Sequence, residues 1–397
     1  MIRNRLIARR PGAKSALGPQ QGGTRRTGKR SLRRGPSARR AGSRSLRRGR
    51  GASAVGRRKG GRRPGVGSAG VSAAPRGIRR WHDAGFLSGV AWRTAYPAAG
   101  VDDAKFALHD HVNRAFAPGG EDGAAPGKRA ETSGAVRAYA EGFMRGTGFS
   151  FSFEPVPLRG TASAVVCAGP NEAALEAVLT QLDRLPLREW IVVVPEQART
   201  AQEIAARYAR SVVVRTDGWT GGAAGRALGA ERTGADIVLF VDGEQPAPAE
   251  TLVRFLRAVD GGMDAALNAR ASGIAKFHQR QPADRMNEFL NFSLGRPDLG
   301  VRSLSALPFA LSRRAINAIG AHALALPAKA HALCILRGLR VGIGGSVPWR
   351  AMPDPGRPNP DPRDLLEAWR EAMALRGGRL SFPDRRRNRA AAGEPAP

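Results

Sequence analysis

The sequence predicts an α/β protein in which helices flank a mainly parallel sheet, with a disordered basic tail before it. Between residues 161 and 350, short apolar runs alternate with helical patterns, and one such run ends at Asp242 with Glu244 just after it. The first 82 residues carry 25 Lys or Arg and no Asp or Glu. Strands that alternate with helices at this spacing indicate right-handed βαβ units, and the block has the size of one domain.

Positive charge is concentrated in the tail. Of the net charge of +31, little belongs to the residues after His82, which hold 39 basic and 33 acidic side chains. Residues 1–80 are mostly Arg, Gly, Ser, Ala and Pro, so they cannot bury enough surface to offset chain entropy. We expect a disordered tail that binds polyanions non-specifically: nucleic acid, an anionic membrane surface or an acidic polymer. No aromatic residue precedes Trp81, so a base-stacking platform is missing there.

The sequence contains no evident targeting or spanning segment. The first ten residues lack the apolar core of a secretory signal, and no stretch approaches the ~20 apolar residues of a membrane span. A transit peptide is the alternative interpretation of the tail, although its Gly and Pro residues disfavour the required amphipathic helix. We expect a soluble, cytoplasmic protein. With only Cys167 and Cys334, a disulfide framework and a cysteine-rich zinc site are excluded.

Residues 81–160 are predicted to form a connecting region with short helical segments. Two fragments, 81–89 and 139–146, share the pattern Gly-Phe-x-x-Gly behind an aromatic residue. The Gly-rich, acidic stretch 118–127 between them is typical of a loop. These patterns assign no function to the region.

Apolar periodicity then defines the elements of the 161–350 block in order. Strands are predicted at 162–168, 190–194, 211–215 and 235–242, and helices at 174–182, 200–210 and from Gly221 onward. After Pro348 the composition changes, because Pro and polar residues dominate. Residues 351–397 are therefore predicted to hold a Pro-rich linker, a helix over 363–375 and a basic cluster at 385–389.

The loop after the first strand excludes two common nucleotide-binding motifs. It reads Ala-Gly-Pro-Asn-Glu over 168–172, without Gly-x-Gly-x-x-Gly or Gly-x-x-x-x-Gly-Lys-Ser/Thr. The Asp242 to Glu244 segment is more informative, since the carboxyl end of a parallel strand faces the crevice where open α/β sheets bind ligands. Two carboxylates there can hold a divalent cation and, through it, a diphosphate. A solvated turn is the other interpretation.

Taken in order, these segments resemble the family 2 glycosyltransferases of the GT-A fold. Residues 163–172 are similar to the family's strand, small loop and Asn-Glu; 225–230 is similar to its basic residue on the helix before the acidic strand. Residues 237–244 are similar to its Asp-x-Asp segment. The resemblance covers about 161–347, roughly half of the chain.

The resemblance implies transfer of a sugar, with inversion, from a nucleotide-diphosphate donor to the hydroxyl of an acceptor that the sequence does not name. Mg²⁺ or Mn²⁺ would assist. In this hypothesis Asp242 lies toward the donor ribose and the metal, Glu244 is the second metal ligand, and Arg226 faces the diphosphate. A solvated helix residue is the other interpretation of Arg226. The implied nucleotide pocket is lined by Ala168, Asn171 and Glu172.

Two departures from the family pattern concern the base of the nucleotide and the catalytic base. Where the family commonly has acids after the second strand, this chain keeps only Glu196, one position late, as a donor-binding candidate. Residues 299–353 contain no Asp or Glu, so the candidate catalytic bases are Asp298, His322 and His331. The competing hypotheses are a catalytically degenerate GT-A binding module anchored to a polyanion by the tail, and an Arg/Gly-type RNA-binding protein.

Overall fold

The computed structural model describes residues 76–116, 129–217, 221–270, 276–348 and 362–382. The chain divides into two compact units, Met1–Gly70 and Val71–Pro397, and all described residues belong to the second. The predicted tail up to residue 75, the predicted loop 118–127, the Pro-rich segment 351–361 and the basic cluster 385–389 lie outside the described residues.

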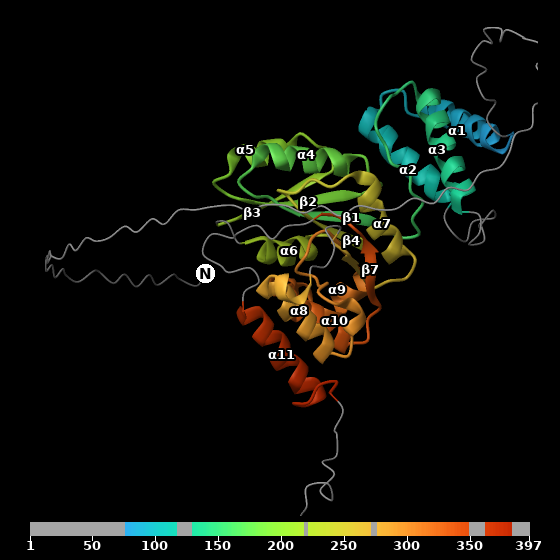
Figure 1. Cartoon of the computed structure of the whole chain (residues 1–397). Helices are drawn as coiled ribbons and strands as arrows, with labels where there is room; N and C mark the ends of the chain where they lie inside the picture. The colour runs from blue at the N-terminus through green and yellow to red at the C-terminus, as the bar shows by residue number, and fades with distance from the viewer. Residues whose placement is uncertain (1–75, 117–128, 218–220, 271–275, 349–361, 383–397) are drawn as a thin grey trace, which may run out of the picture. The chain divides into compact units, whose positions relative to one another are not determined.

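The Val71–Pro397 unit contains a seven-stranded sheet (Figure 1). Its strands are β1 (Ala162–Cys167), β2 (Glu189–Pro195), β3 (Ser211–Thr216), β4 (Ile237–Asp242), β5 (Ala265–Asn268), β6 (Phe309–Ser312) and β7 (Val341–Gly345). Their order across the sheet is β3-β2-β1-β4-β6-β5-β7. All neighbours are parallel except β6, which runs antiparallel to β4 and β5. The predicted α/β class with a mainly parallel sheet is confirmed.

Helices cover both faces of this sheet. They are α4 (Glu172–Asp183), α5 (Arg199–Ala206), α6 (Gly221–Arg232), α7 (Ala249–Asp260), α8 (Pro282–Ser293), α9 (Arg313–Ile319), α10 (Pro327–Leu336), α11 (Pro362–Arg376), and the short 3-10 helices η2 (Phe277–Gln279), η3 (Pro297–Leu299) and η4 (Ala321–Ala325). Figure 1 shows α4 and α5 on one side and α6, α8 and α10 on the other.

Strand periodicity produces two separate cores. Val165 and Val166 are neighbours in β1, yet Val165 packs in the core beneath α6 and α10, whereas Val166 packs in the core beneath α4 and α7. Successive side chains of a strand point to opposite faces, so both faces of an inner strand need apolar residues. This is why β1, β2 and β4 are continuous apolar runs that are buried at nearly every position.

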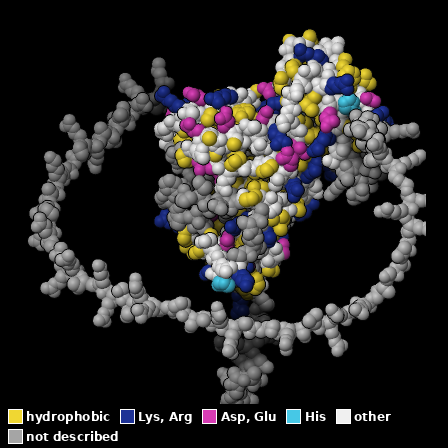
Figure 2. All heavy atoms as spheres, turned by 45° about the horizontal axis from the view of Figure 1, so that its top comes forward, with side chains coloured by type: hydrophobic (Ala, Val, Ile, Leu, Met, Phe, Trp, Pro, Cys, Tyr) yellow, Lys and Arg dark blue, Asp and Glu magenta, His cyan; other side chains and the backbone are white. Residues whose placement is uncertain are grey.

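Three helices precede the sheet: α1 (Arg76–Ala95), α2 (Val101–Phe116) and α3 (Arg129–Thr147). Residues 76–80 of the predicted tail thus belong to α1. The repeated Gly-Phe-x-x-Gly pattern has a structural cause, because α1 and α3 pack through these glycines. A Cβ on Gly85 would collide with the main-chain oxygen of Tyr139, and one on Gly142 with that of His82. Figure 2 shows hydrophobic side chains, in yellow, exposed on this helical group, where Leu87 is 67% exposed.

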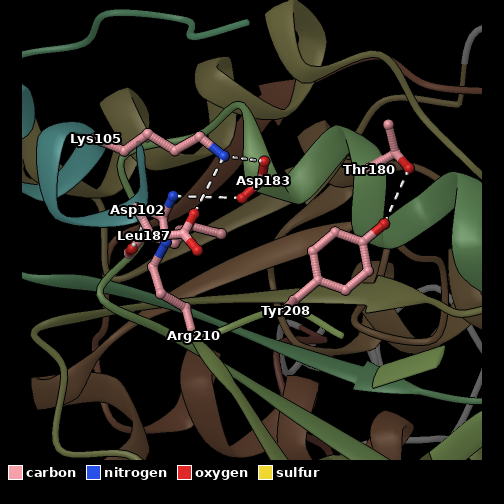
Figure 3. A network of polar contacts seen from close by, with 7 residues as sticks. All are labelled: Asp102, Lys105, Thr180, Asp183, Leu187, Tyr208 and Arg210. Carbon is pink, nitrogen blue, oxygen red and sulfur yellow. Dashed lines mark hydrogen bonds and ion pairs between the residues drawn. The ribbon is translucent and has the colours of Figure 1, made fainter. Parts of the chain in front are cut away.

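A charged network joins α2 to the sheet (Figure 3). Lys105 Nζ donates to Asp183 Oδ2 at 2.5 Å, and Arg210 donates to Asp183 Oδ1 at 3.4 Å. Arg210 also donates to the carbonyl oxygen of Leu187 at 3.0 Å, and its guanidinium lies 4.9 Å from the ring centroid of Phe106. The carboxylate of Asp183 therefore compensates two cations that are almost fully buried.

Candidate functional site

Two loops meet at the carboxyl edge of the sheet, which we define as the edge where β1 and β4 end. The register pairs Cys167, the last residue of β1, with Asp242, the last residue of β4. The loop 168–172 and the segment 242–244 therefore leave the sheet side by side. Ligands of open α/β sheets bind at this kind of position.

A carboxylate bridges these two loops. Glu244 Oε1 accepts a hydrogen bond from the main-chain N–H of Asn171 at 3.0 Å. A Cβ on Gly169 would overlap the Glu244 carboxylate, and one on Gly243 would collide with the carbonyl oxygen of Cys167. The close approach of the two main chains thus requires glycine at 243, whereas a Cβ at 169 would displace the Glu244 side chain. The structure brings the predicted residues Asn171 and Glu244 together.

Asp242 is held by the turn that it starts. Its Oδ1 accepts from the main-chain N–H of Glu244 at 3.0 Å, and its Oδ2 accepts from Gln245 Nε2 at 2.8 Å. An aspartate that accepts from the backbone two residues on is typical of a turn. Each oxygen keeps a further lone pair, so the hydrogen bonds fix the carboxylate while leaving it able to bind a cation.

The other residues of the predicted nucleotide pocket surround the start of α4. Asn171 is the N-cap of the helix, and its side chain accepts from the N–H of Ala174 at 3.2 Å. Glu172 is exposed in the first turn, and Ala168 is buried just after β1. A helix N-terminus carries partial positive charge, which favours a phosphate group. The sequence folds this way because Asn is a preferred N-cap residue.

Arg226 on α6 lies buried behind the acidic residues. Its Nη1 donates to the carbonyl oxygen of Leu304 at 3.1 Å, and the guanidinium lies 5.7 Å from the ring centroid of Phe309. Burial lowers the pKa of Arg226, while Cys167 and Asp242 raise it. Its Nε has no hydrogen-bond partner among the described residues. The prediction of a solvated helix residue is therefore wrong for Arg226, which is 7% exposed.

Glu196 lies at the end of β2 and lines a separate hollow of about 630 Å³ between α5 and β3. The other residues of this hollow are Arg199, Gln202, Glu203, Ala206, Val213 and Arg215. The side chain of Glu196 is exposed, and no described contact joins Glu196 to Asp242 or Glu244. The structure does not bring Glu196 together with the other predicted donor-binding residues.

The structure brings neither Asp298 nor His322 into contact with the residues of this site, and Asp298 lies away from it. Asp298 makes a two-pronged ion pair with Arg296, whose Nη2 also donates to the carbonyl oxygen of Val341 at 2.9 Å. The register places Val341 beside Ala265, at the amino end of β5 and hence at the opposite edge of the sheet from Asp242. The Arg296 side chain holds the pKa of Asp298 below its ordinary value. His322 is exposed on η4.

His331 is fully buried within α10. Its Nε2 lies 2.7 Å from Asn291 Oδ1, and the Asn291 amide donates to the carbonyl oxygens of Gly300 and Arg302. Asn291 therefore accepts the Nε2 proton, and Nδ1 is left without a partner among the described residues. Burial lowers the pKa of His331 to about 3. Such a neutral, enclosed imidazole has no route to an acceptor hydroxyl.

Strand register brings another segment close to Asp242. Ala310 of β6 lies beside Leu239 of β4 and beside Ala266 of β5. Asp242 follows Leu239 by three residues, and Ala269 follows Ala266 by three, so both strands reach the same level. Since neighbouring strands lie ~4.8 Å apart, the segment after β5 begins about 10 Å from Asp242.

This segment carries an ion pair that the sequence patterns missed. Arg270 Nη1 donates to Asp284 Oδ1 in the first turn of α8. Arg270 has a φ of 61°, and its N–H donates to Asn268 Oδ1 at 2.9 Å. Left-handed backbone is uncommon outside glycine and concentrates at binding sites. The sequence gives no motif around Asp284, which follows Pro282 in the first turn of α8.

The residues at the carboxyl edge fit a divalent cation only in part. No group of three or more His, Cys, Asp or Glu that could hold a metal occurs among the residues that the structure describes. Asp242 and Glu244 are therefore the protein ligands available there. Mg²⁺ is usually held by one or two carboxylates together with substrate phosphates and water. The pair fits such a shared site and does not fit a metal centre built from protein ligands alone.

No helix in the described part of the chain is long and apolar enough to cross a membrane. No protein-family model matches the chain. No curated protein matches it significantly.

Solved structures show distant similarity. Glucosyl-3-phosphoglycerate synthase from Mycobacterium tuberculosis, in complex with Mn²⁺, UDP and phosphoglyceric acid, is 18% identical with a TM-score of 0.39, covering 57% of this chain and 80% of that one. A mannosyltransferase from Pyrobaculum calidifontis, in complex with GDP-Man and Mn²⁺, is 16% identical with a TM-score of 0.36, covering 54% and 65%.

A 4-diphosphocytidyl-2C-methyl-D-erythritol synthase from Anaerococcus prevotii is also similar, at 16% identity and a TM-score of 0.35, covering 52% of this chain and 94% of that one. The similar structures thus include glycosyltransferases and a synthase of another class. At these identities and TM-scores the similarity concerns the sheet and its helices, and the function must be argued from the residues themselves.

Proposed function

We propose that this protein is a glycosyltransferase that moves a sugar from a nucleotide-diphosphate donor to an acceptor hydroxyl, with inversion. The observation that carries the proposal is the meeting of Asp242 and Glu244 with the N-terminus of α4, in front of the buried Arg226. Carboxylates for a cation, helix N–H groups and an arginine are the groups that recognise a diphosphate.

The reaction breaks the bond between the anomeric carbon and the diphosphate oxygen, and the electron pair leaves with the nucleoside diphosphate. The acceptor oxygen forms the new bond to that carbon, and its proton passes to a base. Negative charge grows on the leaving group, so fixed positive groups lower the barrier. When held by Asp242 and Glu244, Mg²⁺ or Mn²⁺ supplies part of this positive charge.

Arg226 supplies positive charge that needs no rearrangement. Its guanidinium is fixed by Leu304 and Phe309, and burial in a region of low dielectric strengthens its effect on a nearby anion. The carbonyl oxygen of Leu304 satisfies only one guanidinium nitrogen. The diphosphate of a bound donor would offset the burial of this cation, whose charge Asp242 compensates in part.

We assign proton acceptance to Asp284, and we place the acceptor hydroxyl beside it. Asp284 lies at the start of α8 and pairs with Arg270, and the residue before Arg270, Ala269, lies about 10 Å from Asp242 by the strand register. A spacing of that size leaves room for a sugar between the diphosphate and the acceptor. Its pairing with Arg270 orients the carboxylate and makes release of the arginine a condition of proton transfer.

The test is a transfer assay with a panel of nucleotide-diphosphate sugars in the presence of Mn²⁺ or Mg²⁺. Asp242→Asn should reduce transfer and donor hydrolysis by about a hundredfold or more, because it removes charge next to the diphosphate. Asp83→Asn is the matched control, since Asp83 is 78% exposed on α1. Absence of turnover with every donor would contradict the proposal.

Calorimetric titration with nucleoside diphosphates separates this proposal from a binding module of the same fold. Glu244→Gln should weaken metal-dependent binding, whereas Glu176→Gln, on the exposed face of α4, should not. Metal-dependent binding without any transfer would favour the catalytically degenerate module instead.

A further inference from the structure

α8 carries large apolar side chains on its exposed side as well as on its buried side. It buries Leu290 together with Asn287, Asn291 and Ser293, while Phe289 and Phe292 are 54% and 52% exposed. Helices packed on a core normally turn their apolar side inward. The two phenyl rings of α8 therefore stabilise nothing in the interior and are available to a surface outside this chain.

α11 continues the same exposed surface. One stripe of this helix, Leu365, Ala368 and Ala372, is buried in the core. A second stripe lies one residue further on, where Leu366 and Met373 are 61% and 43% exposed. The helix thus carries more apolar surface than packing on the sheet domain requires.

Aromatic rings join the two helices into one surface. The Phe289 ring lies 5.6 Å from that of Trp369, and the Phe382 ring lies 5.5 Å from that of Phe292. Trp369 Nε1 donates to Ser293 Oγ at 3.1 Å, so the indole presents hydrocarbon outward with its polar group satisfied. We name the following residues the aromatic patch: Phe289, Phe292, Leu366, Trp369, Met373 and Phe382.

Arginines lie next to the aromatic patch on α11 and just after it. The side chain of Arg370, next to Trp369, is 75% exposed and pairs with Glu367, and Arg376 and Arg379 are exposed further along the chain. The sequence from 376 to 389 holds six arginines and one acid. A second copy of this surface would bring like charges together at short range, which opposes self-association. An anionic surface would instead complement the arginines.

We propose that the aromatic patch docks on the surface of an anionic lipid bilayer. Phenyl and indole rings bury their hydrocarbon in the boundary between headgroups and acyl chains, and the arginines contact lipid phosphates. Apolar area alone or basic charge alone binds a membrane weakly. The combination of the two gives stable attachment. This docking is independent of the donor site and goes beyond the proposed transfer reaction.

The experiment is vesicle flotation of the full chain. Vesicles of mixed phosphatidylglycerol and phosphatidylcholine should carry the protein upward, and vesicles of phosphatidylcholine alone should carry much less. Phe289→Ser with Phe292→Ser should lower the fraction bound to anionic vesicles by about tenfold, because two large apolar side chains no longer transfer from water. The unaltered chain and the double variant both keep the whole basic tail. The difference between their vesicle-bound fractions is therefore due to the aromatic patch.

The matched control replaces Leu87 and Val90 of α1 by Ser, because these side chains are also exposed, at 67% and 40%. It should bind anionic vesicles like the unaltered chain. Met373→Ser changes the part of the aromatic patch that lies on α11. It should also lower the fraction of protein bound to anionic vesicles. Circular dichroism should show that all variants are folded, since only exposed side chains change.

Two outcomes would overturn the proposal. One is equal vesicle binding by the patch variants and the α1 control. The other is a dimer in analytical ultracentrifugation that the patch variants convert to a monomer, because the patch would then be covered by a second copy. Loss of sugar transfer in the Asp242 variant leaves vesicle binding unchanged, so failure of the proposed function is distinguishable from failure of the docking.

Discussion

Glu244 Oε1 lies 3.0 Å from the main-chain nitrogen of Asn171, and this hydrogen bond joins the loops that follow β4 and β1. The contact places a carboxylate at the N-terminus of α4, where the helix dipole favours negative charge. A diphosphate that enters this site would compete with Glu244 for the same N–H group, or would share Glu244 through a cation. The geometry of the loops is therefore the first property to test.

Gly169→Ala should impair ligand binding with little effect on folding. The new Cβ overlaps the side chain of Glu244, which can swing away because it is flexible, and the bond to Asn171 is then lost. We expect metal-dependent nucleoside diphosphate binding to fall by about tenfold, the size of one charge-assisted hydrogen bond. Isothermal titration calorimetry measures this. Gly222→Ala is the control, since its Cβ meets open space; equal losses would refute the role of Glu244.

Arg226→Met should impair transfer while preserving the fold. Burial of a charge costs free energy unless the charge is paired, so an apolar side chain of similar length removes that cost. We therefore expect an unchanged or higher melting temperature, together with a loss of transfer on the order of a hundredfold. Arg232→Met on the exposed end of the same helix is the control. If the Arg226→Met variant keeps full transfer activity, Arg226 does not take part in the reaction.

Acid should destabilise the fold through His331. Its pKa falls from 6.5 to about 3 on folding, so the unfolded chain binds the proton more readily and unfolding is favoured as the pH falls from 6.5 toward 3. The group contributes a slope of about 1.4 kcal/mol per pH unit within that window. Burial also lowers the pKa of His109 and of His111, so both add to the slope.

His331→Leu isolates this contribution. The variant should lose stability at pH 7, because Asn291 Oδ1 loses its partner, yet its free energy of unfolding should vary less with pH. Urea denaturation over about three pH units below neutral pH supplies the comparison. His322→Leu on exposed η4 should keep the original slope; identical slopes for both variants would contradict the assignment.

Asp183→Asn should destabilise the unit strongly. The change removes the carboxylate that contacts Arg210, whose side chain is 3% exposed, and leaves Lys105, which is 9% exposed, with only the longer contact to Asp102 at 3.5 Å. Removal of one partner from a buried ion network costs about 3 kcal/mol or more. In urea denaturation, Glu176→Gln should cost only about 0.5 kcal/mol, because its partner Arg207 is 61% exposed. Comparable losses in the two variants would show that the network contributes little.

The sequence by itself determined the layered core and the position of the carboxyl edge. Strands such as β1 and β4 are short and apolar at all but one position each, and only an inner strand with helices on both faces buries such a run. Asn171 is a preferred N-cap, so the start of α4 could be read locally. Local patterns suffice where the physical cause lies within a few neighbouring residues.

Tertiary structure alone decided which residues share the site. The antiparallel β6 aligns the ends of β4 and β5, and so brings the segment of Asp284 near Asp242, whereas Asp298 lies toward the opposite edge. The burial of His331 and the outward turn of Phe289 likewise depend on packing between distant elements. Sequence spacing restricts strand order without fixing it, because contacts across a sheet join residues that are far apart along the chain.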